Sequence, residues 1–228
     1  MSKMRLAKEF VAGLLSSPSW RERMDEITDM GLTGINALFA FLPMGAEVMH
    51  RAAACMGVSV AELAEHRPED ARNIIRRLMW HMNEDSGNIG WGIPEAFGEI
   101  LAASEILAER YKTILISYIM DLQGADNYCD NATLRRSCYW AVGRLAEARP
   151  GLVAKARHWL ANGLEDQDIT CRGMAAWALS QLVPDRLDAP ALRALAGAGH
   201  SELCVLFDGK NVFEKSVSAL AREALERI

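Results

Sequence analysis

The amino-acid sequence predicts an all-α fold, an α-solenoid of about five stacked helix pairs behind an N-terminal capping helix. A ten-residue pattern recurs along the 228 residues, and self-similarity at a period of roughly 20 to 50 residues is typical of repeat architectures. The copies read VMHRAAACMG (48–57), IGWGIPEAFG (89–98), LRRSCYWAVG (134–143), CRGMAAWALS (171–180) and VFEKSVSALA (212–221). Another apolar-periodic stretch precedes each copy, so each repeat is expected to contain two helices.

The last three positions of the pattern are the most regular. The ninth is always apolar, and the tenth is always small: Gly57, Gly98, Gly143, Ser180 and Ala221. A small residue repeated on one helical face lets a neighbouring helix approach closely, and the adjoining apolar column supplies the buried stripe. We therefore expect these two columns where stacked helices touch.

The elements follow in order along one domain, residues 1–228. Residues 1–30 are expected to form the cap, beginning with an amphipathic helix in MSKMRLAKEFVAGLLSS. The first helix of each later pair is expected in INALFAFL, NIIRRLMWHM, TILISYIMDL, VAKARHWLANGL and ALRALAGAG. The five repeats are expected at 31–66, 67–110, 111–149, 150–187 and 188–228.

Composition restricts the compartment and the partners. Lys8 and Glu9 interrupt the apolar stretch that a signal peptide needs, and the longest uncharged run, Met30 to Ala46, is shorter than a membrane span. Five cysteines without a CxxC pair indicate reduced thiols, not a disulfide framework or zinc finger. The net charge of -5 disfavours nucleic acid, because phosphate binding requires clustered Lys and Arg. A cytoplasmic protein without a membrane segment is predicted.

Two stretches carry a resemblance to a known family. LEDQDITCRGMAAWALSQL (164–182) and NATLRRSCYWAVGRL (131–145) resemble the second half of a HEAT-like repeat of the phycobilisome-lyase type, with its pattern L-x-D-x-D-x-x-V-R-x-A-A-x-x-A-L-G-x-L. The resemblance covers about 34 to 228, most clearly in the third and fourth repeats. It implies an armadillo-type superhelix in a bacterial protein. Some family members attach bilins, but fold does not imply function.

The resemblance also implies which face is exposed. The second helix of such pairs usually lines the concave side, and positions three, seven and eleven of the pattern share one polar face. On that face we expect a partner-binding set: Trp91, Glu95, Glu99, Arg136, Trp140, Arg144 and Trp177. Trp is enriched at binding hot spots, and the mixed charges suit a peptide-like ligand. Alternatively, the rings pack between helices and the charges pair weakly with each other.

The stretch MNEDSGNIGWGIPEAFGEI (82–100) places poor helix formers where the repeat expects a helix from about Asn88. Either the helix starts late, with Gly92 near its cap and Pro94 in its first turn, or it starts on time and kinks. The backbone amides at Gly87, Gly90 and Gly92 then form a turn that can hold a ligand at the groove. The alternative is a tight turn packed against the helix that carries Trp80 and His81.

Acids recur in the loops, among them Asp126, Asp130, Glu165, Asp166, Asp168 and Asp208. A metal-binding rim is one interpretation, but the family pattern uses Asp here to cap helices, and we predict caps and no metal site. FDGKN (207–211) is predicted to be a turn. Cys55 and Cys171 are expected in the core and Cys129 at an accessible position, without a neighbouring base to activate it.

Three functions remain open. The first, which we favour, is a non-catalytic scaffold that captures a protein or peptide in its concave groove, without a cofactor. The second is an enzyme similar to the HEAT-like alkylpurine DNA glycosylases, with Trp91, Glu95, Arg136 and Trp140 in the functional roles, although Glu replaces the usual acid and the net charge is wrong for DNA. The third is a lyase or carrier for a small cofactor such as a tetrapyrrole, implied by the family resemblance alone.

Overall fold

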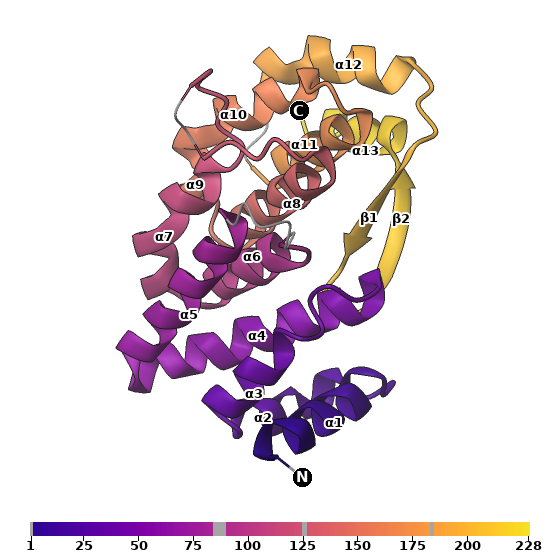
Figure 1. The fold of residues 1–228 in the computed structure, drawn as a ribbon. Helices are drawn as coiled ribbons and strands as arrows, with labels where there is room; N and C mark the ends of the chain where they lie inside the picture. The colour runs from indigo at the N-terminus through magenta and orange to yellow at the C-terminus, as the bar shows by residue number, and fades with distance from the viewer. Residues whose placement is uncertain (1, 84–89, 125–126, 183–184) are drawn as a thin grey trace. The chain divides into compact units, whose positions relative to one another are not determined.

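A computed structural model describes residues 2–83, 90–124, 127–182 and 185–228 (Figure 1). The chain divides into two compact units. We call residues 1–108 with 207–212 the N-terminal unit, and residues 109–206 with 213–228 the C-terminal unit. Helices dominate both, as the predicted all-α class requires. Within the described ranges, no helix combines the length and apolar character needed to cross a bilayer.

The N-terminal unit is built from short helices followed by two long ones. Its elements are α1 (Lys3–Leu15), η1 (Arg21–Arg23), α2 (Met24–Thr28), α3 (Leu32–Leu38), α4 (Ala46–His66), α5 (Pro68–Met82), α6 (Ile93–Ala103) and the start of α7 (Glu105–Ser117). The predicted amphipathic first helix is confirmed: Ser2 caps α1 by accepting from the Arg5 amide, and Val11 and Leu14 are buried.

The packing of α4 on α6 shows why the tenth column is small. A Cβ on Gly57 of α4 would lie 3.0 Å from the backbone of Glu99 on α6, so the two helix backbones approach closely at this point. Met56, next to Gly57, and Phe97 of α6 are both fully buried. The expectation that this pair of columns lies at helix contacts is therefore confirmed at Gly57.

The C-terminal unit continues from α7. Its elements are α8 (Ala132–Ala148), α9 (Pro150–Val153), η2 (Ala154–Ala156), α10 (Arg157–Asn162), η3 (Gly163–Glu165), α11 (Ile169–Ser180), η4 (Arg186–Asp188), α12 (Ala189–Gly197) and α13 (Val217–Leu225). Gly143 of α8 lies under the ring of Trp177 of α11, where a Cβ would be 2.9 Å from the ring carbon Cε3. A small residue of the tenth column therefore also permits close packing between α8 and α11.

The last copy of the pattern departs from the prediction. Strands β1 (Leu203–Phe207) and β2 (Val212–Ser216) pair as a hairpin, so a helix over residues 212–216 is wrong (Figure 1). The physical reason is the turn between them, which was predicted correctly. The Asp208 carboxylate accepts from the Lys210 and Asn211 amides at 2.9 and 2.7 Å, and Gly209 takes a φ of 85°. Only at Ser216, which caps α13, does the repeat's helix begin.

The hairpin tip belongs to the N-terminal unit and is fixed there by aromatic packing. The ring of Phe207 stacks on His50 of α4, with centroids 5.1 Å apart, and contacts Trp20 at 6.3 Å. Arg21 donates to the carbonyl of Gly209. Burial lowers the pKa of His50 to about 4, so this imidazole is neutral at pH 7.

Candidate functional site

On α6, two of the predicted partner-binding residues are buried. Glu95 is 5% exposed and Glu99 is 7% exposed, so the expectation that they face solvent is wrong. Every residue from Ile93 to Ala102 is buried. Within the N-terminal unit, α4 and α5 pack against α6, and the contact with Gly57 of α4 lies at Glu99 itself. Trp91, just before the helix, is 37% exposed.

The two tryptophans of the C-terminal unit form one stack. The rings of Trp140 and Trp177 are nearly parallel, with centroids 6.2 Å apart. Trp140 is only 1% exposed, so its expected exposure is wrong, while Trp177 is half-buried. Trp140 lies inside the α8–α11 contact because Gly143 lets Trp177 close over α8. Glu95 and Trp140 are two of the four residues that the glycosylase hypothesis needs at an accessible surface.

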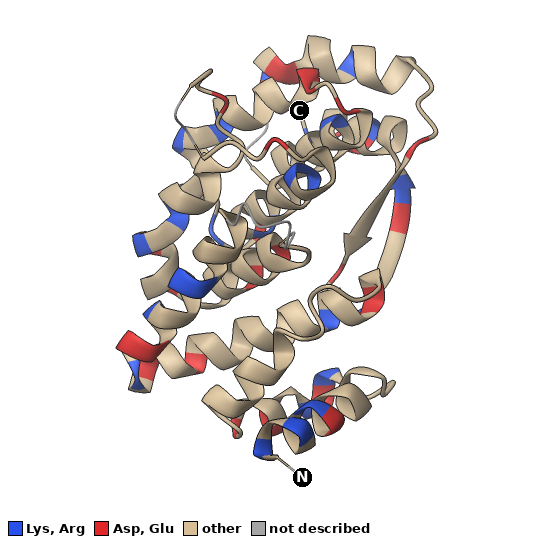
Figure 2. Ribbon diagram, viewed as in Figure 1, with Lys and Arg blue, Asp and Glu red and all other residues tan. Residues whose placement is uncertain are grey.

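The two predicted arginines are half-buried and lie near polar groups of their own unit. The Arg136 guanidinium donates to the Thr170 hydroxyl at 3.4 Å, and Arg144 forms an ion pair with Glu147 at 3.1 Å. Basic and acidic residues are interspersed along the described helices of each unit (Figure 2).

The glycine-rich turn has a structural explanation at both of its described glycines. Helix α6 starts at Ile93, Gly92 precedes it with a φ of 73°, and Pro94 lies in its first turn, so the late start is confirmed. A Cβ on Gly92 would lie 2.9 Å from the carbonyl carbon of Leu42, and one on Gly90 would lie 3.0 Å from the carbonyl oxygen of His81. At these two positions the glycines pack closely against neighbouring backbone, as the alternative interpretation expects. Gly87 lies outside the described residues.

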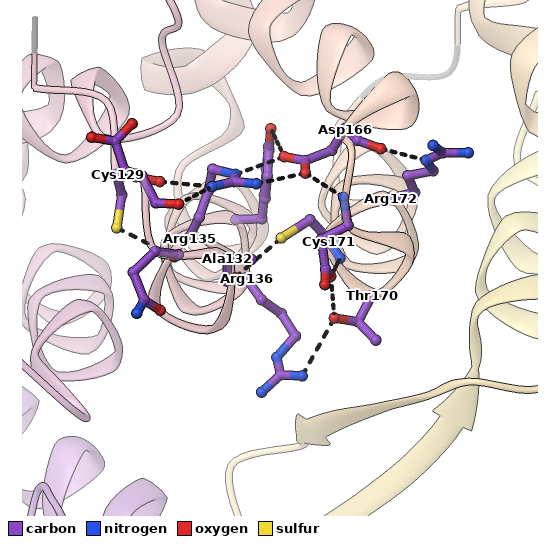
Figure 3. A network of polar contacts seen from close by, with 12 residues as sticks. Cys129, Ala132, Arg135, Arg136, Asp166, Thr170, Cys171 and Arg172 are labelled. Atoms are coloured by element: carbon purple, nitrogen blue, oxygen red, sulfur yellow. Dashed lines mark hydrogen bonds and ion pairs between the residues drawn. The ribbon is translucent and has the colours of Figure 1, made fainter.

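A dense polar cluster lies in the C-terminal unit and is centred on Arg135 of α8 (Figure 3). Its Nε and Nη2 donate to the two carboxylate oxygens of Asp166, each at 2.7 Å, and its Nη1 donates to the carbonyls of Cys129 and Asp130 at 2.9 Å. Both partners are buried. The Asp166 carboxylate, with its hydrogen bond, raises the pKa of Arg135, so the guanidinium remains charged.

Asp166 is held from further sides. Its Oδ1 accepts from the Asp168 amide at 2.9 Å, and its Oδ2 accepts from the Tyr139 hydroxyl at 3.4 Å. Asp168 in turn caps α11 through the Cys171 amide, which confirms the predicted capping role at this position. Asp166, by contrast, anchors Arg135, and the sequence analysis missed this pair, which is separated by 31 residues.

A cavity of about 580 Å³ opens beside this cluster; we call it the Arg135 pocket. Its walls come from residues 119–123 and 128–130, from α8 and α10, and from the segment around η3. Three aromatic side chains line it, Tyr128, Tyr139 and Trp159. The lining includes four acidic residues, Asp121, Asp130, Glu165 and Asp166, and one basic residue, Arg135. The volume is in the range of small-ligand and peptide side-chain sites, and the lining is net acidic.

The cysteines do not contribute an accessible nucleophile among the described residues. All five are buried. The core positions of Cys55 and Cys171 are confirmed, and the expected accessibility of Cys129 is wrong, since it is 9% exposed. The reason is that its amide donates to the Tyr118 carbonyl and its carbonyl accepts from Arg135, so the loop folds inward. Within the described ranges, no three His, Cys, Asp or Glu side chains are grouped to hold a metal ion.

Comparison with known proteins supports the repeat fold. The family of HEAT-like repeats matches residues 132–182, from the start of α8 to two residues past the end of α11, where the sequence pattern is clearest. An uncharacterised protein of Archaeoglobus fulgidus is 28% identical over 162 residues, which are 69% of this chain and 80% of that protein. A designed armadillo repeat protein, solved with the peptide (KR)4, has a TM-score of 0.54 and 16% identity, with 99% of each chain covered. The predicted α-solenoid of HEAT-like or armadillo type is thereby confirmed.

Proposed function

We propose that this chain is a non-catalytic binding protein that holds a peptide segment of a partner protein in the Arg135 pocket. The observation that carries the proposal is a preformed cavity of about 580 Å³ that combines aromatic walls with carboxylates. Repeat solenoids use extended surfaces to bind other chains. The designed armadillo repeat protein with the similar fold holds a peptide, (KR)4, which supports the same type of ligand here.

The chemistry of the pocket floor favours binding over catalysis. Arg135 and Asp166 are both fully engaged by hydrogen bonds. They bind each other, Arg135 also donates to two carbonyls, and Asp166 also accepts from the Asp168 amide and from Tyr139. These hydrogen bonds hold both side chains in fixed positions. Burial raises the pKa of Tyr128 to about 12, so its hydroxyl stays protonated at pH 7. A rigid, hydrogen-bonded floor of this kind keeps a binding site in shape before the ligand arrives.

The sequence-derived set retains two aromatic members with accessible surface. Trp91 in the N-terminal unit and Trp177 in the C-terminal unit expose part of their rings, and we propose that they add contacts to a partner protein. Trp140 contributes by supporting Trp177 from below.

Selection from a random peptide library tests the proposal. The wild type is compared with Trp159→Ala, which removes one wall of the pocket, and with Trp80→Ala as a matched control, since Trp80 is 59% exposed and lies in the N-terminal unit. Circular dichroism establishes that all three are folded. We expect peptides enriched by the wild type and by Trp80→Ala but not by Trp159→Ala. Enrichment of the same peptides by all three, or by none, would refute the proposal.

A further inference from the structure

We infer that the Arg135 pocket binds a cationic side chain, a lysine or arginine of the peptide. This inference rests on the proposed function and names the chemistry of the partner. It depends on three features of the same cavity: the balance of charge, the aromatic walls and the size. The charge and the aromatic walls favour a cation, and the size favours a long side chain over a single ion.

The net charge of the pocket depends on the pairing of Arg135 with Asp166. Its guanidinium is paired with both oxygens of Asp166, so these two charges cancel at the pocket floor. Three carboxylates then remain around the cavity, those of Asp121, Asp130 and Glu165, and all three residues are exposed. In the described part of the chain, none of the three forms an ion pair with Lys, Arg or His within 4.0 Å. An anionic ligand would be repelled, whereas a cation would complete the site.

The aromatic walls suit the same ligand. The Tyr128 ring already makes a cation–π contact within the protein, because the central carbon of the Arg135 guanidinium lies 5.1 Å from the ring centroid. Trp159 is half-buried and lines the cavity, and an indole is the best partner for a cation over its face. Carboxylates beside an aromatic face combine ion pairing with packing of the aliphatic stem of Lys or Arg.

The size indicates more than a single ion. A cavity of about 580 Å³ exceeds the needs of a metal or ammonium ion and accommodates a long side chain with its flanking backbone. Asn162 and Gln167, which line the same cavity, provide amide groups of the kind that pair with an extended peptide backbone.

The test measures binding of a labelled (Lys-Arg)4 peptide by fluorescence anisotropy. A neutral peptide of the same length, with citrulline in place of Arg and acetyl-lysine in place of Lys, is the comparison. The protein variants are Glu165→Gln in the pocket and Glu226→Gln as the control, because both glutamates are exposed and both changes remove one negative charge from the C-terminal unit. We expect the basic peptide to bind more tightly than the neutral one. Glu165→Gln should weaken it about fivefold and Glu226→Gln should leave it unchanged.

The other outcomes separate this inference from the proposed function. Equal binding of the basic and neutral peptides, or equal effects of the two glutamine variants, would overturn the inference, while peptide binding itself would stand. If no peptide of either kind binds and the library selection also fails, both are overturned. Higher salt should weaken binding of the basic peptide only, because screening acts on exposed charges.

Discussion

Gly143→Ala should destabilise the C-terminal unit by about 2 kcal/mol, because the added methyl group has no room. Its carbon would lie 2.9 Å from Cε3 of Trp177, closer still to Cζ3, and 2.9 Å from Cβ of Ala178. Overpacking of this kind costs roughly 1 to 3 kcal/mol. The ring cannot move away freely, since it stacks on Trp140 and loss of an aromatic pair costs about 1 kcal/mol more. The higher helix propensity of Ala returns about 1 kcal/mol.

Urea denaturation followed by tryptophan fluorescence measures this change, with Gly151→Ala as the control. Gly151 lies in α9 of the same unit and has no atom within 4 Å of an added Cβ. That variant should be neutral or slightly more stable, by up to about 0.5 kcal/mol. If Gly143→Ala unfolds at the same urea concentration as Gly151→Ala, then close approach of α8 and α11 does not require a small residue at position 143, and the reasoning is wrong.

Three further changes test other parts of the structure. Asp166→Asn should cost roughly 3 to 5 kcal/mol in a denaturation experiment, because it leaves the buried Arg135 guanidinium without its counter-charge. Gly92→Ala should lower the melting temperature by an amount equivalent to about 2 kcal/mol or more, from its φ of 73° and the close Leu42 carbonyl. Burial lowers the pKa of His50 from 6.5 to about 4, so the folded state resists protonation of this imidazole. The free energy of unfolding should therefore be highest above pH 6.5 and fall by up to about 3 kcal/mol as the pH drops to 4. His50→Phe should remove that part of the pH dependence; an unchanged slope would contradict the assignment.

The elements that the sequence predicts correctly are those with a local signal. The small column is confirmed at Gly57 and Gly143. It could be predicted because the size of a side chain is a property of the residue itself, and the need for a small one recurs in each repeat. The late start of α6 followed from Gly92 and Pro94, whose backbone preferences are intrinsic. The turn after Phe207 followed from its Asp-Gly pair in the same way.

The errors arose where a neighbouring element decides the outcome. Periodicity shows which residues share a helical face, but not which faces another helix covers, and so Trp140 and the two acids of α6 were expected to be exposed. The repeat register likewise predicted a helix over Val212–Ser216, whereas the turn at Asp208 and pairing with β1 stabilise a strand. Local turn chemistry outweighed the repeat at this position.

The Arg135 pocket could not be predicted because its parts come from separate segments. Asp166 stands in a loop where the family pattern places capping acids, and only the fold shows that Asp168 is the cap and that Asp166 binds Arg135. Once that pair is formed, the guanidinium no longer offsets the remaining carboxylates, and the acidic character of the cavity follows. The same ion pair that stabilises α8 against the loop before α11 therefore also determines which charge the pocket accepts. Asp166→Asn should therefore weaken folding and also reduce the preference for the basic peptide, because it leaves the Arg135 charge uncompensated in the pocket, whereas Glu165→Gln should reduce that preference with little loss of stability.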